Sequence, residues 1–267
     1  MATSEPASYY LLKFADNETE RYRASAATSG PWDPRLQHGG PPCALSVRSA
    51  EQSAISHTGR VDLVAVRFSA EFVGPVPVDE IEVSSRVIRA ARSAVLVETV
   101  LSSGGRDCLH ARTWLVRDED TARIAHAPVG AREPADGLEP LHADFAYAQS
   151  IEWRMELGNI DEAGPGRAWA RPRLPLIADE VPTGLQRVAL VGDSASGLSA
   201  ELDWSVWSFV NVDLDIHLAR PMAGDWVLLD AATQLGAHGS AMTRSTVSDV
   251  SGVLGCTAQT LVLAPRR

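Results

Sequence analysis

The chain has 267 residues, 45% of them hydrophobic and 22% charged, which is typical of a globular protein with one large domain or two of ordinary size. Its net charge of −10 argues against a nucleic-acid-binding surface. No apolar run approaches the roughly 18 residues that a membrane-spanning helix needs, so we expect no membrane partner.

The cysteines argue against a metal site and a disulfide framework. Cys43, Cys108 and Cys256 are odd in number and lie far apart, which suits a reducing compartment. The segment 1–16 lacks the basic and apolar regions of a secretory signal. We therefore expect a cytoplasmic protein that binds no metal.

The N-terminal half combines one helix pattern with a series of strand patterns. The helix pattern covers residues 40–56 and directly follows the motif His38-Gly39-Gly40-Pro41-Pro42. The runs that follow alternate or are β-branched, and turn signals such as Gly74-Pro75 and Gly104-Gly105 separate them. These predicted strands are 64–72, 80–89, 94–102 and 108–117.

The C-terminal half repeats this order after a stretch rich in Pro, Gly and Ala, residues 122–140, which we interpret as a linker. A helix is predicted over 183–202, with Thr183 as its N-cap. Strands are predicted before and after it, at 151–157, 167–173, 209–218, 225–232, 238–246 and 252–263.

Matching residues in the two halves indicate an internal duplication. Pro75 followed by Asp79 matches Pro221 followed by Asp225, and Cys108 with 111–113 matches Cys256 with 258–260. The predicted domains are an N-terminal unit (1–121), the linker (122–140) and a C-terminal unit (141–267). An amphipathic helix followed by a long antiparallel meander is best buried by wrapping the sheet around the helix. The expected fold class is α+β, with two tandem hot dog units that form a double hot dog with one joined sheet.

Two sets of residues carry a resemblance to a known family. The first set runs from Trp32-Asp33-Pro34 to the His38-Gly39-Gly40 motif, and the second comprises Asn211-Val212-Asp213, Arg220-Pro221 and Gln259. Over nearly the whole chain they resemble the acyl-CoA thioesterase II (TesB-like) family of double hot dog thioesterases. The resemblance implies hydrolysis of acyl-CoA.

In that family an acid in the second helix, a Thr early in the next strand and a Gln in the last strand hold the attacking water. Residue by residue, these positions are Asp193, Asn211 and Gln259 of this chain, which are the predicted catalytic residues. Asn211 departs from the family's Thr, but an amide also binds water. Asp193 is moreover the lone acid of the apolar run 188–198, which favours a functional role. The alternative interpretation is an ordinary acid on the solvent-facing side of the helix.

Thioester hydrolysis also needs donors that stabilise negative charge on the carbonyl oxygen. Gly39 and Gly40 permit close approach of a ligand, and a helix N-terminus offers unpaired N–H groups. We therefore predict substrate binding at His38, Gly39 and Gly40. The predicted partner is a small acyl-CoA substrate; no cofactor is expected, because coenzyme A belongs to the substrate.

Further predictions concern the rest of the substrate and the number of sites. Tryptophans are expected to line the acyl pocket (Trp32, Trp204 or Trp207), and arginines are candidates for the coenzyme A phosphates (Arg86, Arg89, Arg92, Arg220 and Arg244). In the first half the positions that match Gln259 and Asn211 fall beside Arg112 and near Ala65, and no acid lies within 40–50. One active site per chain is the prediction.

Two alternatives stay open from the residues alone. The first is a non-catalytic module that binds acyl-CoA or a fatty acyl group without activating a water. An enoyl-CoA hydratase of the hot dog type is suggested only by Asp213, Asp215 and His217, which strand alternation places together on one face. Sheet edges of this kind commonly pair, so we expect a homo-oligomer.

Overall fold

The computed structural model describes residues 7–16 and 19–266. In the N-terminal half these form the helix α1 (Gly40–Thr58) and the strands β1 (Tyr10–Ala15), β2 (Thr19–Ala24), β3 (Leu63–Phe72), β4 (Glu80–Ala90), β5 (Ala94–Ser103) and β6 (Arg106–Arg117). In the C-terminal half they form the helices α2 (Ala146–Gln149), α3 (Gly184–Gly192) and α4 (Ala195–Leu198) and the strands β7 (Ile151–Leu157), β8 (Gly166–Pro172), β9 (Trp207–Asn211), β10 (Asp213–Leu218), β11 (Val227–Leu235), β12 (Ser240–Asp249) and β13 (Gly252–Pro265). Short 3-10 turns occur at Ala26–Thr28 and Ala122–Ile124.

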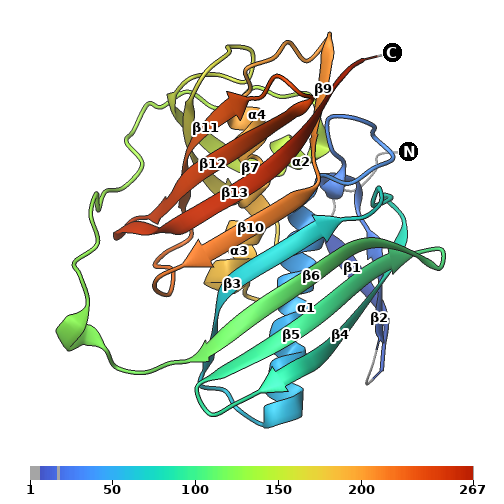
Figure 1. Cartoon of the computed structure of the whole chain (residues 1–267), viewed down its shortest axis with the longest axis vertical. Helices are drawn as coiled ribbons and strands as arrows, with labels where there is room; N and C mark the ends of the chain where they lie inside the picture. Colours follow the sequence, from blue (N-terminus) through green and yellow to red (C-terminus); the bar gives the residue numbers. More distant parts are fainter. Residues whose placement is uncertain (1–6, 17–18, 267) are drawn as a thin grey trace.

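All these strands belong to one 13-stranded sheet, in the order β1-β2-β4-β5-β6-β3-β10-β13-β12-β11-β8-β7, with β9 paired to β13. The two halves of the chain supply the two halves of the sheet (Figure 1). They join where β3 pairs antiparallel with β10, at Ser69 opposite Asp215. The sheet is therefore continuous from one half to the other.

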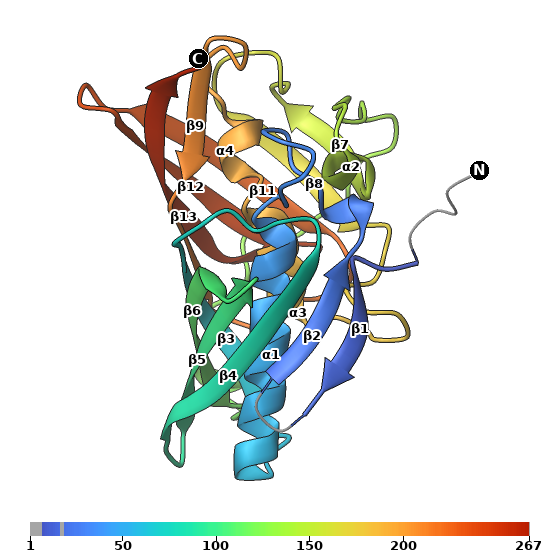
Figure 2. The same ribbon diagram turned by 90° about the vertical axis from the view of Figure 1, so that its right-hand side faces the viewer.

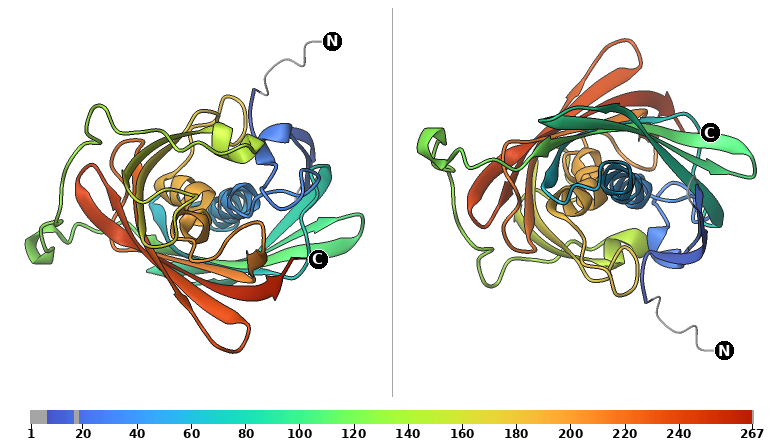
Figure 3. Two further views of the ribbon diagram at one scale, coloured as in Figure 1. Left: turned by 90° about the horizontal axis from the view of Figure 1, so that it is seen from above. Right: turned by 90° about the horizontal axis from the view of Figure 1, so that it is seen from below.

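The two long helices lie side by side within the curve of the sheet, as Figures 2 and 3 show. Pro41 and Pro42 lie in the first turn of helix α1. Backbone N–H groups in a first turn have no partner within the helix, so the proline residues cost no hydrogen bond there. The helix ends at Gly59, whose φ of 66° is the left-handed conformation that closes a helix. Its buried face packs on β4, β5 and α3, so the core includes both halves.

A repeated set of hydroxyl contacts relates the halves in space. Ser85 Oγ lies 2.9 Å from Ser49 Oγ on α1 and 2.7 Å from Thr99 Oγ1 on the neighbouring strand. In the second half, Thr233 Oγ1 lies 2.8 Å from Ser199 Oγ, just after α4, and 2.6 Å from Thr243 Oγ1. In the strand register Ser85 lies directly opposite Thr99, and Thr233 lies directly opposite Thr243. The duplication in the sequence is thus repeated in the side-chain contacts.

The predicted strands of both halves are present, with shifted ends; 151–157 matches β7 without a shift. Strands β1 and β2, which the sequence analysis did not predict, extend the sheet beyond β4. The predicted linker lies within the long connection from β6 to α2, which Figure 1 shows in green beside the sheet.

The prediction of one helix over 183–202 is wrong at its centre, although Thr183 is the N-cap. The helix stops at Gly192 and a short helix follows from Ala195. At this break the Leu190 carbonyl oxygen accepts a hydrogen bond from the Tyr147 hydroxyl at 2.8 Å. The Ser194 N–H bonds to Val191 instead, at 3.0 Å, and this tighter turn interrupts the helix.

The predicted strand 209–218 is two strands. Val212 separates β9 from β10, and its N–H bonds to the Thr260 carbonyl oxygen at 3.0 Å. Because of this step, β9 pairs with the end of β13, while β10 lies between β13 and β3. The step also sets the position of Asn211, the last residue of β9.

Candidate active site

A cavity of about 400 Å³ lies where the two halves meet. The loop before α1, the end of α3 and the strand β9 contribute to its wall. Most of its lining is apolar and aromatic, including the rings of Trp32, Phe72, Phe145, Tyr147, Trp153, Trp204 and Phe209. Such a lining with a few polar groups is typical of a small-molecule site.

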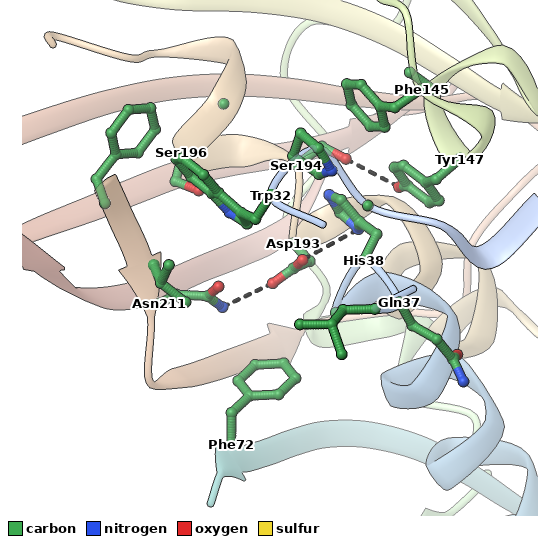
Figure 4. A pocket seen from close by; sticks show the side chains of 18 of the residues that line it. Trp32, Gln37, His38, Phe72, Phe145, Tyr147, Asp193, Ser194, Ser196 and Asn211 are labelled. Carbon is green, nitrogen blue, oxygen red and sulfur yellow. Dashed lines mark hydrogen bonds and ion pairs between the residues drawn. The ribbon is translucent and has the colours of Figure 1, made fainter. Parts of the chain in front are cut away.

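Asp193 is a buried acid in the wall of the cavity. It is the C-cap residue of α3, is only 6% exposed, and turns its carboxylate toward Asn211 and His38 (Figure 4). Its Oδ1 accepts a hydrogen bond from Asn211 Nδ2 at 2.7 Å, and its Oδ2 lies 3.2 Å from His38 Nδ1. A buried carboxylate persists where such groups satisfy it.

The two predicted amides meet Asp193 from different directions. Gln259 Nε2 lies 3.1 Å from the Asp193 carbonyl oxygen and 3.2 Å from Oδ1. Gln259 is 1% exposed, and its Oε1 has no hydrogen-bond partner among the described residues. Asn211 lines the cavity, whereas Gln259 is buried behind Asp193 and does not. Gln259 thus contacts the acid from behind, and Asn211 reaches both the acid and the cavity.

His38 occupies the opposite side of the carboxylate. Its ring is stacked on Tyr147, with centroids 3.7 Å apart and planes at 7°. Tyr147 is itself fixed by its hydrogen bond to Leu190 and by Ser194 Oγ at 2.9 Å (Figure 4). Burial lowers the pKa of the His38 imidazole, an effect that the negative charge of Asp193 partly opposes.

The two glycines have different surroundings. Gly39 touches the site: a Cβ there would lie 2.8 Å from Asp193 Oδ2 and 2.7 Å from the Phe72 ring. A Cβ on Gly40 would lie 2.0 Å from the Leu190 carbonyl oxygen, so Gly40 allows α1 to approach α3. The Gly40 N–H points to His38 Nδ1 at 3.1 Å, while the Gly39 N–H has no partner among the described residues. Because Pro41 and Pro42 carry no N–H, Gly39 provides the unpaired donor at this helix end.

The structure thus brings Asp193, Asn211, Gln259, His38 and Gly39 together, with Gly40 directly behind. Of the predicted tryptophans, Trp32 and Trp204 line the cavity and stack on each other at 5.1 Å, whereas Trp207 does not line it. None of the predicted phosphate-binding arginines lines it. Arg220 is instead held by the buried carboxylate of Asp249, and Arg86 pairs with Glu98.

The residues that suggested a hydratase lie away from this cavity. Asp215 pairs with Arg67 across the joint between the halves, and Asp213 accepts hydrogen bonds from Thr260. His217 is exposed, and the residues between these three are buried, so all three are on the side of β10 away from the core.

Sequence reasoning missed Tyr147 and Ser194. Tyr147 belongs to α2, a helix of four residues that is too short to produce a periodic pattern. Ser194 follows Asp193, and only the interruption of the helix turns its hydroxyl toward Tyr147.

Residues 7–16 and 19–266 were compared with the requirements of two kinds of site. They contain no group of three or more His, Cys, Asp and Glu side chains placed to hold a metal ion. They also contain no helix with the length and hydropathy needed to span a membrane.

Comparison with family models gives matches over most of the chain. The model of the acyl-CoA thioesterase N-terminal domain matches residues 28–116, and that of the C-terminal domain matches residues 123–263. No curated protein sequence matches significantly.

Solved structures with the same overall arrangement share little sequence with the chain. A candidate thioesterase from Novosphingobium aromaticivorans has 22% identity and a TM-score of 0.73, covering 97% of this chain and 99% of that one. A protein of unknown function with a hot dog fold, from Alicyclobacillus acidocaldarius, has 15% identity, a TM-score of 0.74 and 96% coverage of both chains. The acyl-CoA thioesterase II TesB2 of Mycobacterium marinum has 15% identity and a TM-score of 0.70, covering 96% and 95%. At these identities the likeness identifies the hot dog fold.

Proposed function

Because the chain belongs to the acyl-CoA thioesterase family and is a thioester hydrolase, we propose that it hydrolyses acyl-CoA to a free acid and coenzyme A with a water activated at Asp193. The observation that carries this assignment is the buried carboxylate in the wall of the cavity, oriented by two amides from β9 and β13. A group fixed in this way is pre-organised for catalysis, because it need not rearrange during the reaction.

Asn211 and Gln259 position the water and the Asp193 carboxylate. The Nδ2 group of Asn211 donates to Asp193 and to the Asp213 carbonyl oxygen, at 2.7 and 3.0 Å. Its Oδ1 is then the atom that is free to accept a hydrogen bond from water in the cavity, which is the role of the family's Thr. Gln259 acts mainly on Asp193, because it lies behind the acid and outside the cavity lining.

Gly39 binds the thioester carbonyl oxygen. Its unpaired N–H is at the start of α1, where the helix dipole favours negative charge, and its missing side chain lets the carbonyl approach Asp193. Gly40 and His38 shape this end of the cavity. An N–H placed there stabilises the oxyanion that forms when water attacks.

The acyl group occupies the aromatic part of the cavity. Trp32, Trp204 and Phe209 contact one another, with ring centroids 4.5 to 5.1 Å apart, and they pack on a small apolar cluster of β9, β12 and β13. Burial of an acyl chain against these rings favours binding by roughly 0.8 kcal/mol for each CH₂ group.

Each half of the chain is proposed to be one hot dog unit, with 1–121 and 141–267 as the units and 122–140 as their connection. The matching hydroxyl contacts of the two halves support this division. A cytoplasmic location is proposed from the free thiols of Cys43, Cys108 and Cys256. Assembly into a homo-oligomer stays a prediction.

Release of free thiol from a series of acyl-CoAs with graded chain lengths tests the proposal, with Asp193→Asn as the matched variant. Asparagine keeps the shape of the side chain and removes its basicity, so kcat should fall by at least about 100-fold. Thermal denaturation of both proteins checks that the variant is folded. Tight binding of acyl-CoA without thiol release by the unmodified protein would indicate a binding module instead.

A further inference from the structure

We propose that the indole ring of Trp204 forms the end of the acyl pocket and sets the longest acyl chain that the protein hydrolyses efficiently. This inference rests on the proposed hydrolase function and on the placement of the acyl group against the aromatic part of the cavity. The ring lines the cavity and is held there by contacts from both halves of the chain.

The Trp204 ring has a fixed position. Its Nε1 donates a hydrogen bond to the Ile160 carbonyl oxygen at 3.2 Å, so the polar atom of the ring is satisfied. The ring stacks on Trp32 of the first half, with centroids 5.1 Å apart and planes at 30°. Phe209 meets it edge-on, with centroids 4.5 Å apart. Aromatic rings at these distances stabilise one another, so the indole is part of a preformed wall.

The backbone that carries the ring is held as well. The N–H groups of Val206 and Trp207 donate to the Asp203 carbonyl oxygen, at 3.1 and 2.9 Å, and form a tight turn around Trp204. The Trp204 carbonyl oxygen accepts a hydrogen bond from Arg266 Nη1 at 2.8 Å. The indole therefore keeps its place when a longer acyl chain meets it.

Two paths along the backbone place this wall close to the catalytic groups. On the helical side, a Cβ on Gly197 would lie 3.6 Å from Trp204 Cη2, and Gly197 is four residues after Asp193, which is about 6 Å at the rise of a helix. On the strand side, Phe209 is two residues before Asn211, which is about 7 Å in a strand. Both paths leave room for only a short stretch of acyl chain between the thioester carbon and the ring.

Apolar side chains lie behind the ring. Trp204 packs on a cluster that includes Ala200 and Leu261, which are 5% and 1% exposed. Because the ring separates this cluster from the cavity that it lines, truncation of Trp204 would extend the cavity by an apolar hollow. Such a hollow would accept further CH₂ groups of an acyl chain, and their burial would favour binding.

The test measures kcat/KM for thiol release from saturated acyl-CoAs of increasing length, from butyryl-CoA to palmitoyl-CoA. The variants are Trp204→Ala and Trp204→Leu, and Trp204→Leu decides the test if Trp204→Ala does not fold. The matched control is Trp207→Ala, because Trp207 is a partly buried tryptophan nearby in the chain that does not line the cavity. Thermal denaturation checks that each variant is folded.

In the unmodified protein we expect kcat/KM to rise with chain length and then to fall once the chain reaches the ring. In Trp204→Ala this maximum should move to acyl chains longer by about two to four carbon atoms, because the hollow that truncation leaves collapses in part. Chains just beyond the original maximum should gain about fourfold in kcat/KM for each CH₂ group that now finds a place. Trp204→Leu should give a smaller shift in the same direction, whereas Trp207→Ala should keep the original maximum.

An unmodified protein whose kcat/KM does not fall at any length up to palmitoyl-CoA would overturn the inference. A folded Trp204→Ala or Trp204→Leu protein with the original maximum would do the same, as would an equal shift in Trp207→Ala. In each of these cases thiol release persists and the hydrolase function stands. Absence of thiol release from the unmodified protein at every chain length would instead contradict the proposed function itself.

Discussion

Replacing Gly39 by alanine adds one methyl group at the position where the first half of the chain touches Asp193. The backbone of Gly39 is right-handed helical, with φ −66° and ψ −21°, so alanine is tolerated there without strain. The methyl group would lie 2.8 Å from Asp193 Oδ2, 2.9 Å from Cγ and 2.7 Å from the Phe72 ring. The effect of the substitution is therefore confined to these contacts.

The size of the effect follows from the displacement that the methyl group requires. Ordinary van der Waals contact begins near 3.4 Å, so the carboxylate or the Gly39 segment must move by about half an ångström. A misplacement of 1 Å lowers rates by roughly 100-fold, and we therefore expect kcat/KM to fall by about 10-fold or more. Overpacking of this kind destabilises by about 1 to 3 kcal/mol, which lowers Tm by a few degrees in a chain of this size.

Two neighbouring glycines serve as controls in the same thiol-release and thermal-denaturation assays. Gly197→Ala also adds a methyl group in the cavity wall, but its closest neighbour is Trp204 at 3.6 Å, so activity should be unchanged. Gly40→Ala places a methyl group 2.0 Å from the backbone of α3 and should prevent normal folding. A fully active, folded Gly39→Ala protein would refute the argument, because the reaction would then not depend on the placement of Asp193.

Two further predictions concern stability. Burial raises the pKa of Glu51 from 4.5 to about 7, although hydrogen bonds from Gln186 and Thr183 act to lower it. The folded protein therefore binds more protons than the unfolded chain between these values, so stability falls as pH rises through this window, by up to about 3 kcal/mol. In Glu51→Gln, urea denaturation at pH 5 and 8 should show this loss reduced; an unchanged difference would contradict it. Asp249→Ala should destabilise the fold by about 3 kcal/mol, because it leaves the Arg220 guanidinium without its buried carboxylate, and a Tm within 2 °C of the unmodified protein's would argue otherwise.

Alternation of buried and exposed residues made most of the sheet predictable from the sequence. β5 alternates strictly, with Val95 and Val97 buried, and β7 has the predicted bounds. β1 was missed because it does not alternate: only Tyr10 is buried, while Leu11, Leu12 and Phe14 are exposed. Its place in the sheet comes from pairing with β2, a contact that a local pattern does not encode.

The residues of the site were predictable where their chemistry conflicts with their surroundings. Asp193 is an acid in an apolar run, and Gln259 is an amide in a buried strand; both are buried in the structure and contact each other. Tyr147 carries no such conflict, since a buried tyrosine is ordinary. Its importance arises from its contacts in the fold: its hydroxyl bonds to the Leu190 carbonyl oxygen near the end of α3, and its ring stacks on His38. A contact between residues this far apart in the chain depends on the complete fold.

The matching hydroxyl contacts also show why the duplicated halves need not have duplicated activity. Ser49 and Ser199 occupy equivalent places, and six residues before them lie Cys43 and Asp193. In the strand register Gln259 lies opposite Thr243 in the second half, and Ala111 lies opposite Thr99 in the first. Ala111 is therefore the counterpart of Gln259, one residue away from Arg112, beside which the sequence analysis placed it. A buried thiol and a methyl group thus stand where the second half has the acid and its amide. Because neither can orient a water or accept its proton at neutral pH, we infer a single active site per chain, with the first half supplying His38 and Gly39 to the acid of the second.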